Sequence, residues 1–244
     1  MMQKDRRMQP QAIVTGATGG IGRAIALALR DGGYSVLALG RSATALAELA
    51  REPGLTPLAA DMTQDDAVMR AIAGWQPDVL VNNAGLMPPP GNFCDLDASG
   101  IDRALAVNLG SVLKVTRQIA PGMRARGRGH VFFTGSTAGH APFPGMALYC
   151  ATKSAIAGFA QALRLDLAAS GVRVTEIVAG RVETGLYRDV LSEEARAAMY
   201  AGHSAVQPAD VAAMVMAVIG LPQTVDVSRF DILPTQPASA TGSK

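Results

Sequence analysis

Several features are scarce in this chain of 244 residues, and each scarcity excludes a class of protein. Two cysteines, Cys94 and Cys150, are too few for a disulfide framework and are typical of a reducing compartment. A formal net charge of +2 is too weak a bias to indicate a nucleic acid or an anionic membrane as partner. The three histidines, His130, His140 and His203, share no metal-ligand spacing with one another or with the cysteines, so no metal site is predicted.

Long hydrophobic runs are missing as well. No apolar run reaches the roughly 18 residues that span a bilayer, and the longest, Val211 to Leu221, lies between Asp210 and Pro222. The charged N-terminus is followed by a stretch that glycines interrupt, which is unlike the core of a signal peptide. The sequence therefore predicts a cytoplasmic protein with no membrane partner. Because 49% of the residues are hydrophobic, the chain can nevertheless bury a large core, which excludes disorder.

The chain alternates short apolar runs with longer amphipathic ones. Unbroken apolar runs indicate strands covered on both faces, as in parallel sheets, and their alternation with helical spacing indicates βαβ units. The sequence therefore predicts an α/β fold, a single doubly wound parallel sheet of the Rossmann type with helices on both faces. Strands are expected at 12–14, 34–39, 55–60, 78–81, 131–134, 172–178 and 230–233, and helices at 21–30, 43–51, 64–73, 101–126, 147–169 and 208–219.

One domain is predicted over residues 11–236, between a flexible N-terminal tail at 1–10 and a C-terminal tail at 237–244. No internal repeat, low-complexity tract or linker divides it. Residues from about 181 to 206 lack regular spacing, and an irregular segment of that length inside a compact domain is usually functional. We expect this segment to be a lid over a substrate.

A glycine-rich turn joins the first expected strand to the first expected helix. The sequence TGATGGIG at 15–22 has the spacing Gly-x-x-x-Gly-x-Gly. Glycine lets the backbone turn tightly and approach a pyrophosphate, which binds the N–H groups at a helix N-terminus. The turn therefore predicts a nucleotide site, with Gly16, Thr18, Gly20, Ile21 and Gly22 as its residues.

The ends of the second and third expected strands bear on which dinucleotide binds. An acid after the second strand would bind a ribose 2′-hydroxyl and indicate NAD, but Gly40-Arg41 stands there. The fork of an arginine suits a 2′-phosphate, so Arg41 predicts NADP in preference to NAD, unless it is a solvated loop residue. Asp61, followed by Met62, ends the third strand, where its carboxylate either accepts from an adenine amino group or caps the next helix.

Tyr149 and Lys153 stand four residues apart, on one face of an expected helix. Bringing a tyrosine pKa from near 10 to about 7 requires roughly 4 kcal/mol. An ammonium about 5 Å away supplies roughly 3 kcal/mol at an effective dielectric near 20, and the positive nicotinamide of an oxidised cofactor adds to it. The pair therefore suits general acid/base chemistry near neutrality. Ser136, after the fifth strand, is placed to donate a hydrogen bond to a substrate carbonyl.

Together these motifs resemble the classical short-chain dehydrogenase/reductase family over about residues 10–236. The resemblance implies a catalytic tetrad in which Tyr149 is the general acid/base and Lys153 lowers its pKa and holds the nicotinamide ribose. It also implies that Ser136 orients the carbonyl and that Asn108 holds a water in a proton relay by interrupting its helix. The matching residues are TGATGGIG at 15–22, Asp61, NNAG at 82–85, Asn108, Ser136 and YCATK at 149–153.

The resemblance completes the expected cofactor site. Asn83 belongs to the matching NNAG turn, which is otherwise an ordinary Asn-rich turn. Val182 and Thr184 match the segment that binds the nicotinamide amide, although Ala179-Gly180 replaces its usual Pro-Gly, which puts the rigidity of the loop in question. In families of this pattern Arg41 marks NADP preference. The C-terminal stretch 226–236 resembles NADP-dependent 3-hydroxy acid dehydrogenases of the serine or allo-threonine type.

The function expected from the sequence is hydride transfer between NADP(H) and a secondary alcohol or ketone carbon, with a small-molecule substrate such as a 3-hydroxy acid or a polyol. An NADP-binding redox sensor without turnover is the alternative, and the tetrad also permits dehydration or epimerisation. A homodimer or homotetramer is expected, since the family forms such oligomers and two long helices carry small residues suited to close packing between subunits. These residues include Ala155, Ala157, Gly158 and Ala160.

Overall fold

The computed structural model describes residues 9–202 and 204–236, so the predicted tails at 1–10 and 237–244 lie outside the described residues except for positions 9 and 10. Seven parallel strands form one sheet in the order β3-β2-β1-β4-β5-β6-β7. The order of the strands reverses between β1 and β4, which is where open α/β sheets bind ligands. The strands are β1 Gln11–Thr15, β2 Ser35–Gly40, β3 Leu55–Ala59, β4 Val79–Asn82, β5 Gly129–Thr134, β6 Val172–Ala179 and β7 Arg229–Ile232.

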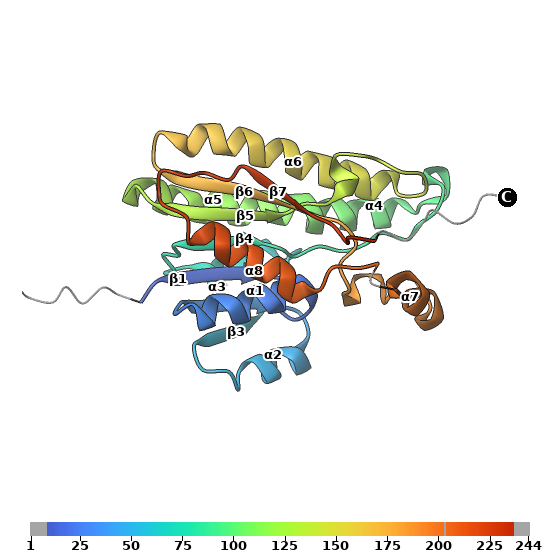
Figure 1. The fold of residues 1–244 in the computed structure, drawn as a ribbon, viewed down its shortest axis with the longest axis horizontal. Helices are drawn as coiled ribbons and strands as arrows, with labels where there is room; N and C mark the ends of the chain where they lie inside the picture. The colour runs from blue at the N-terminus through green and yellow to red at the C-terminus, as the bar shows by residue number, and fades with distance from the viewer. Residues whose placement is uncertain (1–8, 203, 237–244) are drawn as a thin grey trace, which may run out of the picture.

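Helices cover both faces of this sheet (Figure 1), which confirms the predicted doubly wound α/β fold. In β1, Ala12 and Val14 pack toward α1 and α8, whereas Ile13 packs toward α3, α5 and α6. No helix of the described residues combines the length and the hydropathy needed to cross a bilayer. The helices are α1 Gly20–Asp31, α2 Ala43–Leu49, α3 Asp65–Ile72, α4 Ala98–Leu105, α5 Ser111–Arg126, α6 Ala147–Ala168, α7 Glu193–Tyr200 and α8 Pro208–Ile219.

The single helix predicted over 101–126 is divided in the structure. A π-helical turn at Ala106–Gly110 separates α4 from α5. Such turns interrupt the regular hydrogen-bond ladder of a helix and occur frequently at functional sites. Asn108, at which the family resemblance predicts an interruption, lies inside this turn.

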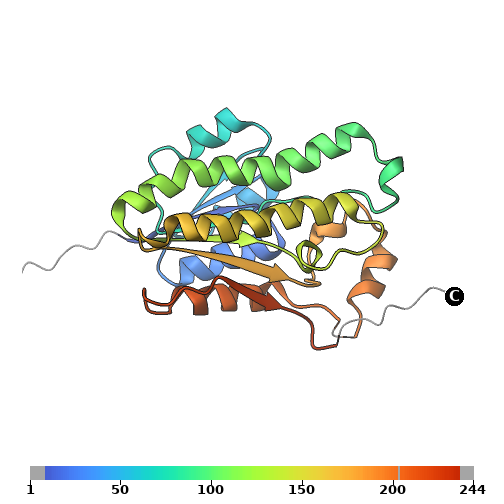
Figure 2. The same cartoon turned by 90° about the horizontal axis from the view of Figure 1, so that it is seen from above.

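Figure 2 shows α5 in green and α6 in yellow, side by side across one face of the sheet. The outer face of α6 is open, since Leu165 is 70% exposed and a Cβ added to Gly158 would meet no atom within 4 Å. Ala157 and Ala160 do not contribute to that face, because both are buried. The expectation that they line a subunit interface is therefore wrong. Of the small residues named, Gly158 is the one on the exposed face of α6.

The predicted lid at 181–206 is more regular than its sequence indicates. It contains a 3-10 turn, η4 Gly185–Tyr187, and the helix α7. Figure 1 shows α7, in orange, beyond the end of the sheet. A bridge between Val182 and Val206 closes the base of the segment, and the N–H of Glu183 donates to the Val206 carbonyl at 2.9 Å.

Candidate active site

A cleft of about 730 Å³ lies along the carboxyl ends of the central strands. Of the residues predicted to form the site, only Gly22 and Asn108 do not line it. The structure thus brings together residues that are far apart in the sequence. The predicted residues that line the cleft are Gly16, Thr18, Gly20, Ile21, Arg41, Asp61, Met62, Asn83, Ser136, Tyr149, Lys153, Val182 and Thr184.

The glycine turn has the geometry that a pyrophosphate requires. Gly16 and Gly20 have φ values of 66° and 52°, in the left-handed region that glycine adopts without strain. A Cβ on Gly22 would lie 2.3 Å from the Gly16 carbonyl oxygen, so Gly22 allows α1 to pack against the turn and does not line the cleft. The first N–H groups of α1 have no partner within the helix and begin at the cleft. The turn therefore fits a dinucleotide diphosphate.

Thr15 and Asn83 fix this turn to the neighbouring strands. The Thr15 hydroxyl accepts hydrogen bonds from the N–H groups of Asn83 and Ala84, each at 3.0 Å. The Asn83 amide donates to the carbonyls of Thr15 and Gly16 at 3.2 Å, and its oxygen accepts from the Thr134 hydroxyl at 3.2 Å. Asn83 therefore belongs to a clamp between the ends of β1, β4 and β5, and the turn is not an ordinary Asn-rich one.

Arg41 and Asp61 lie at the rim of the cleft. Arg41 is exposed and makes no ion pair with any residue that the structure describes. Asp61 accepts hydrogen bonds from the N–H of Thr63 at 2.9 Å and from its hydroxyl at 2.8 Å. These bonds lower the pKa of Asp61, and the charge of Arg41 adds to the effect. The cap of α3 is Gln64, so Asp61 does not cap that helix.

Tyr149, Ser136 and Lys153 come together in the same cleft. Tyr149 lies in the first turn of α6, and Ser136 precedes a 3-10 turn, η3 Thr137–Gly139. The Ser136 side chain acts on the Tyr149 phenol and lowers its pKa. The Lys153 ammonium lies 5.7 Å from the centre of the Tyr149 ring and donates to the Thr134 carbonyl at 2.7 Å. A hydroxyl pair and a cation are thus in place for proton transfer.

Burial has the largest effect on the pKa values of Tyr149 and Lys153. It raises the pKa of Tyr149 above its ordinary value, Tyr187 adds to the rise, and the Ser136 side chain opposes it. Burial also lowers the pKa of Lys153 to about 8, while Glu176 opposes this change. Without dinucleotide the phenol is therefore protonated at neutral pH. The expected lowering of the Tyr149 pKa by the Lys153 ammonium is therefore wrong for the protein without dinucleotide, because burial raises that pKa and Lys153 is not among the groups that act on it. The further lowering by an oxidised nicotinamide stays a prediction.

Asn108 lies behind the cleft and is 2% exposed. Its oxygen accepts from the N–H of Leu86 at 2.8 Å, and its amide donates to the Leu86 carbonyl at 2.9 Å. The amide also reaches the Thr152 hydroxyl at 3.4 Å. Asn108 therefore fixes Leu86, a residue of the cleft wall, to the π-helical turn and to α6.

Sequence reasoning missed residues that act through backbone or tertiary contacts. Thr134 anchors Lys153 by its carbonyl, and Thr15 holds the Asn83 turn, but neither residue type in isolation signals such a role. Tyr187 lines the cleft and packs against the cluster around Tyr149, and its only signal was its place in the predicted lid. Among the described residues, no group of three or more His, Cys, Asp or Glu is placed to hold a metal.

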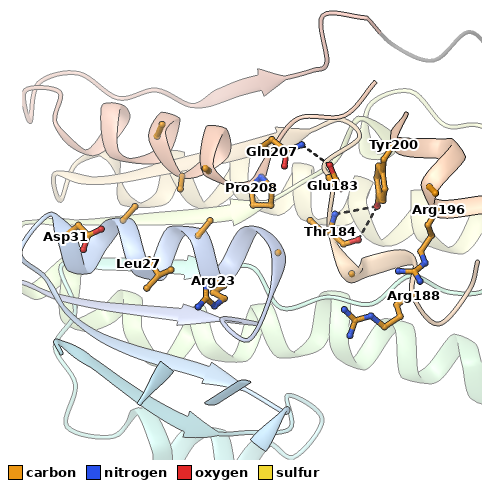
Figure 3. Close-up of a pocket in the computed structure, with 18 of the residues that line it drawn as sticks. Arg23, Leu27, Asp31, Glu183, Thr184, Arg188, Arg196, Tyr200, Gln207 and Pro208 are labelled. Carbon is orange, nitrogen blue, oxygen red and sulfur yellow. Dashed lines mark hydrogen bonds between the residues drawn. The ribbon is translucent and has the colours of Figure 1, made fainter. Parts of the chain in front are cut away.

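Figure 3 shows how the predicted lid segment is attached, in a second groove of about 960 Å³ bordered by α1, α7 and α8. The Tyr200 hydroxyl donates to the Thr184 carbonyl at 3.1 Å and accepts from the Thr184 N–H at 3.5 Å. Nearby, Gln207 donates to Glu183 at 2.9 Å. A Cβ on Gly20 would lie 2.9 Å from the Thr184 methyl, so this end of the lid contacts the glycine turn directly.

Comparison with known proteins identifies the family, since residues 10–195 match the short chain dehydrogenases. The chain belongs to this family. This short-chain dehydrogenase is 46% identical to an uncharacterized short-chain type dehydrogenase/reductase of Sinorhizobium fredii, over 92% of its own length and 91% of that protein. It is 34% identical to an NADP-dependent 3-hydroxy acid dehydrogenase of Salmonella typhimurium, over 91% of its own length and 94% of that protein.

A solved structure supports the same assignment for this short-chain dehydrogenase. The closed form of serine dehydrogenase complexed with NADP⁺ matches it with a TM-score of 0.89 and 31% identity, over 96% of this chain and 99% of that one. The family resemblance predicted from the motifs is thus confirmed. The protein is an oxidoreductase that acts on CH–OH groups.

Proposed function

We propose that this short-chain dehydrogenase uses NADP(H) to move a hydride between the nicotinamide and a secondary alcohol or ketone carbon, with Tyr149 transferring the proton. One observation carries the proposal: Tyr149, Ser136 and Lys153 meet in the same cleft as the glycine turn. The NADP-dependent relative and the NADP⁺ complex of a similar structure support the choice of cofactor.

Each residue of the group has a distinct part in carbonyl reduction, for which the bound cofactor supplies the hydride. The Ser136 hydroxyl orients the carbonyl, and the Tyr149 phenol donates its proton to the carbonyl oxygen. Burial favours the protonated phenol, which is the form that a general acid requires. Lys153 holds the nicotinamide ribose and stabilises the phenolate that remains. Asn108, in its π-helical turn, holds Leu86 in the wall of the site, and the proton relay through a water that the family resemblance implies stays a prediction.

The remaining cleft residues hold the dinucleotide. The glycine turn formed by residues 16–22 would hold the diphosphate, Asp61 and Met62 would hold the adenine, and Asn83 would support the turn from its clamp. Val182 and Thr184 would hold the nicotinamide amide. Arg41 binds the 2′-phosphate, because it is at the rim and its guanidinium makes no ion pair with described residues.

Replacing Arg41 with alanine tests the cofactor preference. Hydrogen bonds to a charged group contribute about 1.5–3 kcal/mol, so kcat/KM with NADPH is expected to fall roughly 10- to 150-fold. The value with NADH should stay close to that of the wild type, since NADH has no 2′-phosphate. The measurement is kcat/KM for both cofactors in Arg41→Ala and in Arg188→Ala, the other arginine of the cleft, in which the ratio should not change. An unchanged NADPH/NADH ratio in Arg41→Ala would show that Arg41 does not read the 2′-phosphate.

A substrate screen tests the function as a whole. The C-terminal stretch and the 3-hydroxy acid dehydrogenase relative favour a 3-hydroxy acid, with a polyol as the other candidate. The screen follows NADPH oxidation with β-keto acids, keto sugars and aromatic ketones. Turnover of at least one class supports the proposal. Binding of NADPH with no turnover in any class would favour a redox-sensing protein.

The oligomer and the location are part of the proposal. The exposed face of α6, with Gly158 and Leu165, supports a homodimer or homotetramer that packs through α5 and α6. Light scattering at micromolar concentration is expected to give two or four times the 25.2 kDa of one chain. A single species of 25.2 kDa would contradict it.

Two free cysteines, Cys94 and Cys150, support a cytoplasmic location.

A further inference from the structure

Glu176 is a carboxylic acid in the interior of the molecule. It lies in β6, whose eight residues are all buried, and is itself 1% exposed. Taking a carboxylate out of water costs several kcal/mol unless charged or hydrogen-bonding groups compensate. An acid at this position therefore requires an explanation, and neither the dinucleotide site nor the proposed proton transfer uses it.

The two carboxylate oxygens of Glu176 have different surroundings. Oε1 lies 2.9 Å from Nε2 of His140, whose side chain is 26% exposed. Oε2 is buried and has no hydrogen-bond partner among the described residues. Oε1 thus has one partner, a partly exposed imidazole, and Oε2 has none among the described residues.

The carboxylate of Glu176 lies directly behind the active site. A Cβ placed on Gly135 would come within 2.3 Å of Oε1, so the carboxylate packs against the backbone between Thr134 and Ser136. The Thr134 carbonyl is the group that accepts the hydrogen bond from the Lys153 ammonium. The negative charge of Glu176 raises the pKa of Lys153, against burial, which has the larger effect and lowers it to about 8.

His140 is fixed to the same part of the fold. It directly follows η3, the short turn that begins after Ser136. The Ser154 hydroxyl donates to the Gly139 carbonyl at 2.9 Å, which holds the end of this turn to α6 at the residue after Lys153. The backbone thus places His140 and Lys153 near one another, and Glu176 interacts with both of them.

Other charges do not replace Glu176. Its register partner on β7 is Arg229, which pairs with Asp231 at 3.1 Å. Its register partner on β5 is the uncharged Phe133. The charge that acts on the pKa of Lys153 is that of Glu176. The titratable groups that act on the neighbouring Tyr149 are Tyr187 and Cys150.

We propose that Glu176, held by His140, is a positioning residue that keeps the buried Lys153 ammonium charged. The inference rests on the proposed function, in which a charged Lys153 holds the ribose and stabilises the Tyr149 phenolate. With the carboxylate in place, the ammonium persists to higher pH than burial alone would allow. Glu176 thereby extends the pH range of carbonyl reduction toward the alkaline side.

The titration of Lys153 tests this inference without cofactor or substrate. Lys4, Lys114, Lys153 and Lys244 are the only lysines of the chain, so ¹³C-lysine labelling gives few signals. The Cε resonance of Lys153 is the one lost in Lys153→Arg. In Glu176→Gln, Lys153 is expected to titrate about one pH unit lower than in the wild type, since a nearby opposite charge has been removed. The other three lysines should not shift.

Matched variants separate charge from structure. Glu176→Asp retains the carboxylate, so most of the wild-type titration of Lys153 should return. Asp78→Asn removes a carboxylate just before β4, at the amino ends of the strands, and should leave Lys153 unchanged. Circular dichroism checks the fold of each variant. If Glu176→Gln does not fold, Glu176→Ser, which leaves room for water, replaces it with the same expected shift.

The pH profile of kcat/KM gives a second readout. Removing the carboxylate of Glu176 lowers the pKa of any neighbouring group, so the alkaline limb of carbonyl reduction moves to lower pH by about one unit in Glu176→Gln. A purely structural role would lower the plateau without moving the limb. A Lys153 resonance that titrates as in the wild type would overturn the inference. If the titration of Lys153 shifts in Glu176→Gln but the wild type turns over no substrate, the result would support the electrostatic inference and contradict the proposed function.

Discussion

Replacing Tyr149 with phenylalanine is expected to reduce kcat for carbonyl reduction about 10²- to 10⁴-fold, the usual contribution of a general acid. Phenylalanine keeps the ring that packs with Met87 and Cys150 and loses only the hydroxyl that interacts with Ser136. The fold and the binding of NADPH should therefore be retained. Stopped-flow or steady-state NADPH oxidation measures the first quantity, and the change in NADPH fluorescence on binding measures the second.

Tyr187→Phe is the matched control for this experiment. Tyr187 also lines the cleft and packs beside Tyr149, and it loses the same atom on substitution. Because it has no part in the proposed proton transfer, its kcat should stay within a few-fold of the wild type. Wild-type turnover in Tyr149→Phe would refute the mechanism, whatever the result for Tyr187→Phe.

Asn108→Ala is expected to lower the free energy of unfolding by about 2–6 kcal/mol, because a backbone donor and a backbone acceptor would each lose a partner at about 1–3 kcal/mol. Those two groups are the N–H and the carbonyl of Leu86, which the buried Asn108 amide bonds at 2.8 and 2.9 Å. Urea unfolding followed by circular dichroism measures the change. Since Leu86 lines the cleft, the KM for NADPH should rise as well.

The control for this prediction is an asparagine at the surface. Asn92 accepts one hydrogen bond, from the N–H of Cys94 at 3.0 Å, in an exposed turn. Water can replace its side chain, so Asn92→Ala should cost no more than about 1 kcal/mol. If Asn108→Ala were as stable as Asn92→Ala, the two bonds to Leu86 would not hold the π-helical turn in place.

Local patterns in the sequence were sufficient for most of the fold. Buried parallel strands such as β1 and β6 are short apolar runs, and helices such as α1 and α8 have regular apolar spacing, so both are visible within a few residues. The π-helical turn at 106–110 was not predicted from the spacing, because bonds from Asn108 to a distant strand end stabilise it. The helix α7 was missed for a different reason: none of its residues is buried, so no apolar face marks it in the sequence.

Residues of the cleft could be predicted where a residue type of suitable chemistry stands at the end of an expected strand. Protonation was not predictable in the same way. The spacing of Tyr149 and Lys153 indicates how near the charges lie, but it carries no information on how much water burial removes from each group. Glu176 shows the same limit, because in the sequence it is one acid inside an apolar strand, and only the folded chain places it behind Lys153.

The phenol of Tyr200 has a consequence for the movement of α7. It bonds both backbone groups of Thr184, so α7 cannot move away unless those bonds break or the segment around Thr184 moves with it. Because Thr184 lines the cleft, a displacement of α7 that keeps these bonds would also displace this part of the cleft wall. Tyr200 thereby links α7 to the wall of the cleft through a single side chain.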